Sequence, residues 1–109
     1  MLGVAYKRDI NDVRESPALG IAEQLLDKGA DLCYHDPFIP EMRLDGKGTL
    51  KNTELTDEIL RQCDCVLVVT DHSALDYEKV VTLAPLIIDT RNATRKLDVA
   101  EHEAKIIRL

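Results

Sequence analysis

Short apolar runs alternate along the chain with longer segments in which apolar residues recur at helical spacing. Continuous apolar runs at residues 65–69 and 86–89 are typical of strands that are buried on both faces of a sheet. Two further strands are predicted at residues 2–6 and 30–35, and a last one, at the edge of the sheet, at residues 105–109. We expect residues 65–69 to form the central strand.

Three helices are predicted between these strands. The first opens at Ser16 and Pro17, because a serine side chain accepts a free backbone N–H there and proline loses no hydrogen bond. Gly29 closes this helix, since glycine adopts a positive φ without strain. Shorter helices are expected at residues 56–61, capped by Thr56, and at residues 76–83. Residues 38–51 are predicted to form a long surface loop, with space for a short strand near residues 49–50.

Alternation of strands and helices predicts an α/β fold. We expect a Rossmann-like three-layer α/β/α sandwich with a mostly parallel sheet of about five or six strands. The 109 residues contain no internal boundary or repeat, so residues 1–109 are expected to form one domain. The strand at residues 2–6 starts without a lead-in, which we interpret as the mark of a domain taken from a longer polypeptide.

Composition narrows the class of partner. The chain has 20 acidic and 14 basic residues, a net charge of -6, and no basic run that would engage nucleic acid. No apolar stretch approaches the ~20 residues that cross a bilayer, and the N-terminus lacks the pattern of a signal peptide. We therefore expect a cytoplasmic protein that binds neither nucleic acid nor membrane.

The three cysteines are odd in number and lie beside or within apolar runs. Cys63 and Cys65 are separated by one residue, which is not the Cys-x-x-Cys spacing of metal and redox sites. We interpret these two residues and Cys33 as reduced, buried thiols, and we predict no metal site.

Ligands of such sheets gather outside the carboxyl ends of the strands, so polar residues there are candidates for binding. Residues 7–16 form a polar loop that brings cations to the start of the first helix, where free N–H groups favour anions. Lys7 and Arg14 are therefore candidates for clamping a diphosphate. The alternative is that they pair at the surface with the carboxylates of the same loop, which are Asp9, Asp12 and Glu15.

The same loop lacks the glycine-rich fingerprint of a dinucleotide site. No glycine lies between Gly3 and Gly20, so the backbone has no means of approaching a pyrophosphate closely. Asp36 follows the second predicted strand, where a dinucleotide-binding domain places its ribose-binding acid. Without the glycines, we interpret Asp36 as a turn former in the pair Asp36-Pro37.

Two further strand ends carry polar residues. Residues 70–73 read Thr-Asp-His-Ser, but neighbours in one loop rarely converge on a reacting atom, so no hydrolytic triad is predicted. We expect a turn in which Asp71 or Ser73 caps the next helix, with ligand contact by His72 as the less favoured alternative. Arg91 has a planar guanidinium suited to phosphate or carboxylate, and its structural alternative is a pair with Asp89 or another nearby acid.

Five blocks of sequence occur in a fixed order: GVAYK at residues 3–7, DVRESPA at 12–18, YHDP at 34–37, VTDH at 69–72 and IDTRN at 88–92. Together they resemble the C-terminal, UDP-sugar-binding domain of the UDP-glucose/GDP-mannose dehydrogenase family, over nearly the whole chain. Residues 10–12 and 89–92 look closest to members that oxidise UDP-N-acetylglucosamine or UDP-N-acetylmannosamine.

The resemblance implies a two-step, NAD-dependent oxidation of the C6 alcohol of a UDP-hexose or UDP-N-acetylhexosamine to a uronate, for surface polysaccharide precursors. In that family, an N-terminal domain holds NAD and a central helical domain carries the nucleophilic cysteine. This chain resembles neither domain, so no catalytic residue is expected in it and the isolated chain should be inactive. By analogy, Lys7 and Arg91 bind the UDP-sugar and Arg14 reaches toward NAD. The complete enzyme is expected to be a homo-oligomer.

Two other classes remain open. A standalone Rossmann-like module that binds a nucleotide and regulates a partner would keep its affinity for UDP-sugars without any other domain. A phosphoacceptor signalling domain has a similar size and layer order, but it needs clustered acids after the first strand. This chain has Lys7 and Arg8 at that place.

Overall fold

A parallel sheet forms the centre of the computed structural model, which describes all of residues 1–109. Strands β3 (Val66–Val68), β4 (Ile87–Asp89) and β5 (Ile106–Arg108) pair in that order, with β5 at the edge. Leu2 extends the sheet beyond β3, because it forms parallel bridges with Val68 and with His35. The α/β class and the parallel sheet are as predicted, but the sheet has three strands and not the expected five or six. With the bridges of Leu2 and His35 counted, β3 takes the predicted central place.

The first two predicted strands are much shorter than expected. Full strands at residues 2–6 and 30–35 are wrong, since only Leu2, Tyr34 and His35 take part in bridges. Gly3 turns the backbone with a φ of 76°. The following N–H groups, of Val4 and Ala5, then donate to the side chain of Asp36 at 2.7 and 3.1 Å. A carboxylate thus replaces the neighbouring strand as hydrogen-bond acceptor.

Helix α1 (Pro17–Asp27) begins where predicted, and α2 (Asp57–Gln62) lies one residue beyond its predicted range of 56–61. The Ser16 side chain accepts the N–H of Ala18 at 3.2 Å, and Thr56 caps α2 in the same manner through Ile59. Gly29 follows α1 with a φ of 87°, as expected for a helix end. No helix combines the length and apolar content that a membrane crossing requires.

Helix α3 (Tyr77–Leu83) has a different cap from the one predicted. Asp76 accepts the N–H of Lys79 at 3.1 Å. The expectation that Asp71 or Ser73 caps this helix is wrong, because both side chains bind residues of the loop at 7–16 instead.

Residues 38–51 contain a β-hairpin where a loop was predicted. Strand β1 (Glu41–Leu44) pairs antiparallel with β2 (Gly48–Lys51), which includes the short strand expected near residues 49–50. Met42 and Leu44 alternate with exposed residues and belong to the same buried cluster as Ala18 and Ala22 of α1. The hairpin was not predicted because each of its strands has only four residues. So short a strand shows too little alternation of apolar and polar residues to be distinguished from a loop.

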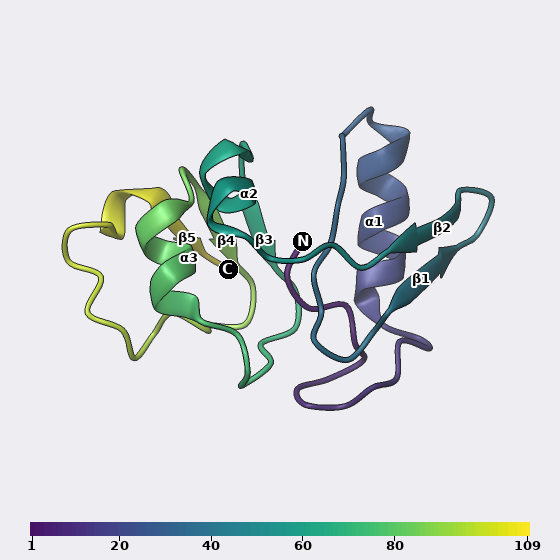
Figure 1. The fold of residues 1–109 in the computed structure, drawn as a ribbon, viewed down its shortest axis with the longest axis horizontal. Helices are drawn as coiled ribbons and strands as arrows, with labels where there is room; N and C mark the ends of the chain where they lie inside the picture. Colours follow the sequence, from purple (N-terminus) through teal and green to yellow (C-terminus); the bar gives the residue numbers. More distant parts are fainter.

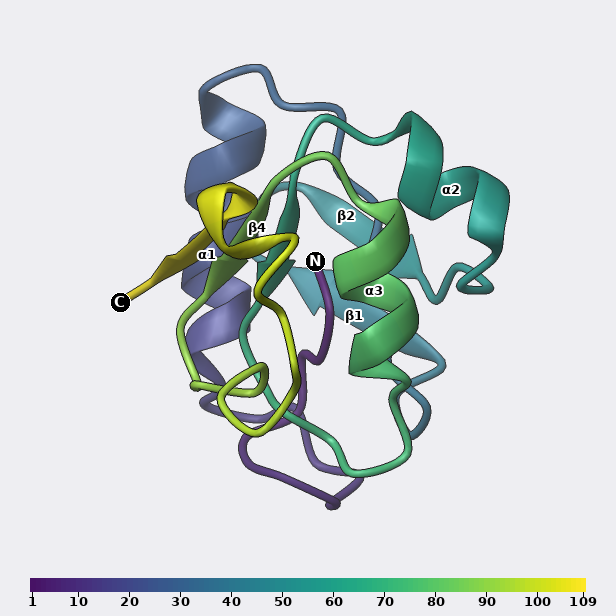
Figure 2. The same ribbon diagram turned by 90° about the vertical axis from the view of Figure 1, so that its left-hand side faces the viewer.

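The elements form three layers. Helices α2 and α3 lie beside strands β3 to β5, and α1 and the hairpin lie together at the other end of the molecule (Figure 1). The view turned by 90° shows β4 between α1 on one side and α2 and α3 on the other (Figure 2). Each side has its own buried cluster, with Leu60, Val80 and Ile87 in one and Val4 and Tyr34 in the other. The three-layer arrangement agrees with the prediction.

Candidate functional site

Three loops meet at the carboxyl edge of the sheet. They comprise residues 6–16, 69–76 and 90–97, and side-chain contacts between Asp9 and Ser73 and between Arg8 and Asp71 join the first two. The only three non-glycine residues with positive φ, which are Asp9, Glu15 and Asn92, all lie in these loops. Such backbone conformations cost about 1–3 kcal/mol each and tend to gather at functional sites.

A hollow of about 380 Å³ lies where these loops meet. It is lined mostly by polar and charged side chains from all three loops and the start of α3: Arg8, Asp71, Ser73, Tyr77, Arg91, Asn92, Ala93, Arg95 and Lys96. Four of these side chains are cationic and one is a carboxylate. Such an excess of positive charge favours an anionic ligand.

Asp71 lies between two of the three arginines of this hollow, Arg8 and Arg91. Its Oδ2 accepts from Nη2 of Arg8, and its Oδ1 is 3.6 Å from Nε of Arg91. The Asp71 side chain is only 8% exposed, whereas those of Arg8 and Arg91 are 61% and 50% exposed. The carboxylate therefore anchors both guanidinium groups while leaving further N–H donors open to solvent.

Asp89 shapes the turn that carries Arg91. It is fully buried and accepts the N–H groups of Arg91, Ala93 and Thr94 at 3.1, 3.0 and 2.9 Å, and the Thr94 hydroxyl at 2.7 Å. Burial opposes its ionisation, but these hydrogen bonds outweigh burial and lower the pKa of Asp89. Asp89, the acid named as the structural partner of Arg91, binds the backbone of this turn, and the Arg91 guanidinium pairs with Asp71 instead.

Lys7 and Arg14 lie outside the hollow. Arg14 bonds to Asp12 of its own loop, with Nη2–Oδ2 and Nε–Oδ1 distances of 2.8 and 3.0 Å, and its side chain is 86% exposed. These bonds lower the pKa of Asp12 to about 2. Lys7 is exposed and takes part in no ion pair. The structure brings Arg91 together with Arg8, and not with Lys7 or Arg14.

Three cations of the hollow were not predicted from the sequence. Arg8 follows Lys7 directly, and Arg95 and Lys96 form a consecutive basic pair shortly after Arg91. The sequence shows the cation next to Lys7 and the basic pair after Arg91. Nothing in the local sequence, however, distinguishes Arg8 from Lys7. The distinction depends on Asp71, which is 63 residues away.

Asp36 does more than form a turn. Its Oδ1 accepts the N–H of Phe38 at 2.8 Å, as a turn former would, while its Oδ2 lies 2.8 Å from Nε2 of His72. The other ring nitrogen of His72 accepts the N–H of Asp9 at 2.9 Å, and Ser73 donates its hydroxyl to Asp9. The His72 ring is fully buried, so it offers no face to a ligand and makes no contact with the serine of a triad.

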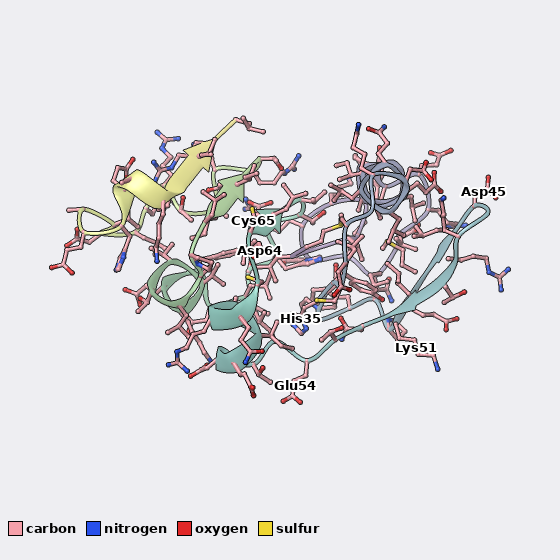
Figure 3. The ribbon with its side chains drawn as sticks, turned by 90° about the horizontal axis from the view of Figure 1, so that it is seen from above. His35, Asp45, Lys51, Glu54, Asp64 and Cys65 are labelled. Atoms are coloured by element: carbon pink, nitrogen blue, oxygen red, sulfur yellow. The ribbon has the colours of Figure 1, made fainter.

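A second, mostly apolar groove of about 550 Å³ lies at the amino ends of the strands, and all three cysteines line it. Figure 3 labels four of its lining residues, which come from three segments near the middle of the molecule: His35, Glu54, Asp64 and Cys65. Burial raises the pKa of the Cys63 and Cys65 thiols. Cys63 and Cys65 are only half-buried and Cys33 is exposed, so the prediction of three buried thiols is wrong. Cys33 is exposed because residues 30–33 form no strand.

Ligands of open α/β sheets bind at the carboxyl edge, which selects the cationic hollow and not the larger apolar groove. The loops around the hollow are fixed by hydrogen bonds to three buried carboxylates, those of Asp36, Asp71 and Asp89. The hollow is therefore the candidate site, with Arg8 and Arg91 as its central cations.

Comparisons with known proteins show the kind of domain that this chain represents. Residues 1–96 match the model of the UDP-glucose/GDP-mannose dehydrogenase family, UDP binding domain. A UDP-glucose 6-dehydrogenase of Rickettsia bellii is 36% identical over 109 residues, covering 91% of this chain and 24% of the relative. A UDP-N-acetyl-D-mannosamine dehydrogenase of Methanococcus maripaludis is 26% identical over 100 residues, covering 84% of this chain and 22% of the relative.

A solved structure shows the same fold. The UDP-N-acetyl-mannosamine dehydrogenase of Staphylococcus aureus superposes with a TM-score of 0.67 at 26% identity, covering 98% of this chain and 24% of that one. The chain thus spans about a quarter of the length of the relatives it matches. Because the family model covers most of its residues, the chain belongs to the UDP-glucose/GDP-mannose dehydrogenase family and corresponds to its UDP-binding domain.

Proposed function

We propose that this chain is the substrate-binding domain of an NAD-dependent UDP-sugar 6-dehydrogenase, which oxidises the C6 alcohol of a UDP-hexose or UDP-N-acetylhexosamine to a carboxylate. Membership of the family supports the reaction class. The observation that carries the binding role is the convergence of Arg8 and Arg91 on Asp71 in a hollow with a cationic excess.

The chemistry of the hollow suits a nucleoside diphosphate. Each guanidinium has N–H donors beyond those that face Asp71, and a planar fork binds two phosphate oxygens at once. Arg91 is proposed to bind the diphosphate of the UDP-sugar. Lys7, one residue before Arg8 and free of ion pairs, is proposed to reach the bound sugar nucleotide from the side of the hollow.

The chain is proposed to bind and orient the substrate without providing the nucleophile. All three cysteines line the groove at the amino ends of the strands and none lines the hollow. The raised pKa of Cys63 and Cys65 lowers the fraction of reactive thiolate at neutral pH. The nucleophilic cysteine is therefore assigned to another domain of the same polypeptide.

NAD supplies the acceptor for the hydride when it is bound. The loop at residues 7–16 lacks the glycines that let a backbone approach a pyrophosphate, so this chain does not form a self-sufficient NAD site. The exposed guanidinium of Arg14, steadied by its two bonds to Asp12, fits an outlying contact to a cofactor held by a neighbouring domain.

The complete enzyme is proposed to be a cytoplasmic homo-oligomer that supplies uronates for surface polysaccharides. The partners of this chain are then the N-terminal and central domains of the same polypeptide. The UDP-sugar would be bound between these domains and the hollow.

Calorimetric titration of the complete polypeptide with UDP tests the binding role. Arg91→Ala removes charge-assisted hydrogen bonds worth about 1.5–3 kcal/mol, so the affinity should fall about 10- to 100-fold. Arg43→Ala, an equal change on the exposed face of β1, should leave the affinity unchanged. Equal affinities of wild type and Arg91→Ala would remove Arg91 from the site. Full affinity of residues 1–109 alone would instead favour a standalone nucleotide-binding module.

A further inference from the structure

His72 lies in the loop at residues 69–76 and connects it with the loop at residues 7–16 and with Asp36. Its ring is fully buried, with the edge of Phe38 packed against it at a centroid distance of 4.9 Å. One ring nitrogen faces Asp36 at the end of the second sheet segment, and the other faces the backbone of Asp9 in the loop at residues 7–16. No buried side-chain polar atom of the chain lacks a hydrogen-bond partner, so this connection is complete.

The contacts of His72 define its tautomer. Nδ1 receives the N–H of Asp9 at 2.9 Å, so this nitrogen acts as an acceptor and carries no proton. The ring proton is then on Nε2, which donates to Asp36 at 2.8 Å. The same carboxylate oxygen also accepts the N–H groups of Val4 and Ala5. A neutral imidazole therefore satisfies both partners and links the backbone of the first segment to that of the loop.

The peptide that His72 holds is the one that follows Arg8. Asp9 has a φ of 61°, a conformation that a non-glycine residue keeps only when its surroundings hold it. Ser73 fixes the Asp9 side chain through its N–H and hydroxyl, at 2.8 and 2.6 Å. Asp71 of the same turn binds the Arg8 guanidinium. Residues 71–73 thus bind three groups of residues 8 and 9: the Asp9 N–H, the Asp9 carboxylate and the Arg8 guanidinium.

We propose that His72 is a positioning residue for sugar-nucleotide binding: through its unprotonated Nδ1 it holds the Asp9 peptide and so directs Lys7 and Arg8 toward the ligand. The proposal rests on the proposed function, because it assigns the cations of this loop to a UDP-sugar. His72 acts through the loop and not by contact, since its ring is 0% exposed and both nitrogens are engaged.

Two substitutions separate this role from simple packing. The amide of His72→Asn reaches the place of Nδ1, so it can still accept the N–H of Asp9, but Asp36 loses the donor that Nε2 provides and keeps only its backbone donors. The amide of His72→Gln reaches the place of Nε2, so it can still donate to Asp36 but leaves the N–H of Asp9 free. Each variant loses one buried hydrogen bond, so the two should lose similar amounts of stability.

The readouts are UDP affinity by calorimetry and hydrogen exchange of the Asp9 amide, both in the complete polypeptide. We expect His72→Gln to weaken UDP binding about ten-fold, or about 1.4 kcal/mol, and to remove protection of the Asp9 amide. His72→Asn should bind within about two-fold of wild type and keep that protection. Equal weakening by both variants would overturn the positioning role and leave only a structural one.

The same measurements distinguish a failure of the His72 role from a failure of the proposed function. Wild-type affinity in both His72 variants, together with weakening by Arg91→Ala, would overturn the role of His72 and keep the proposed function. Undiminished binding in Arg91→Ala as well would remove Arg91 from the site, and failure of the wild-type polypeptide to bind UDP would overturn the proposed function itself. Nitrogen-15 NMR of wild-type His72 gives a test that needs no variant: a protonated Nδ1 would exclude acceptance from Asp9 and overturn the proposal.

Discussion

Gly3 allows the first segment of the sheet to pack directly against the loop after β3. Its φ is 76°, and a Cβ at this position would lie 2.0 Å from the carbonyl oxygen of Thr70. Thr70 has little freedom to retreat, because its hydroxyl donates to the carbonyl of Ala5 at 2.7 Å and the N–H of Val69 donates to that of Leu2 at 2.9 Å. Gly3→Ala should therefore disturb the edge of the sheet that carries the site.

The expected loss follows from two costs. A left-handed backbone costs alanine about 1–2 kcal/mol, and overpacking a rigid contact adds about 1–3 kcal/mol. Gly3→Ala should thus lower the free energy of unfolding by about 2–5 kcal/mol. This loss is a large part of the roughly 5–15 kcal/mol that stabilises a typical small domain. The measurement is urea unfolding of residues 1–109, followed by circular dichroism.

Two other glycines provide matched controls. Gly29 has a φ of 87° but open space around its Cβ position, so Gly29→Ala should cost only about 1–2 kcal/mol. Gly20 lies within α1 with open space, so Gly20→Ala should stabilise the domain by about 0.5–1 kcal/mol. A loss for Gly3→Ala no greater than that for Gly29→Ala would refute the close contact with Thr70.

Two further predictions concern charge. Arg14→Ala should lower the turnover of the complete enzyme. Its unfolding midpoint should stay unchanged, because the Arg14 side chain bonds only to Asp12. Steady-state kinetics that match wild type would exclude Arg14 from the cofactor site. The pKa of Asp89 is lowered in the fold, so its stabilising effect is present above the ordinary value of 3.8 and is lost as pH falls through the folded value. As pH falls from 5 to 2, roughly the range of acid unfolding, the urea midpoint of Asp89→Asn should therefore fall less steeply than that of wild type. An equal slope in both proteins would contradict the lowered pKa of Asp89.

The sequence by itself determined the elements that depend on near neighbours. Ser16, Thr56 and Gly29 act on backbone groups within a few residues, so the limits of α1 and α2 could be predicted from local chemistry. Continuous apolar runs likewise identified β3 and β4, because burial on both faces leaves no polar position. The blocks of sequence that resemble a family identified the kind of domain. They also predicted a binding role for Arg91, which the structure places in the hollow.

Only the tertiary structure decided which cations meet. Arg8 lines the hollow and Lys7 does not, because Asp71, 63 residues away, approaches one of them. Asp36 looked like a turn former, but it accepts backbone N–H groups from residues 31 and 32 positions away and thereby ends the first segment of the sheet. Such contacts depend on the order of the strands and the path of the loops between them. Those properties are set by the packing of the whole chain, and no local pattern of residues records them.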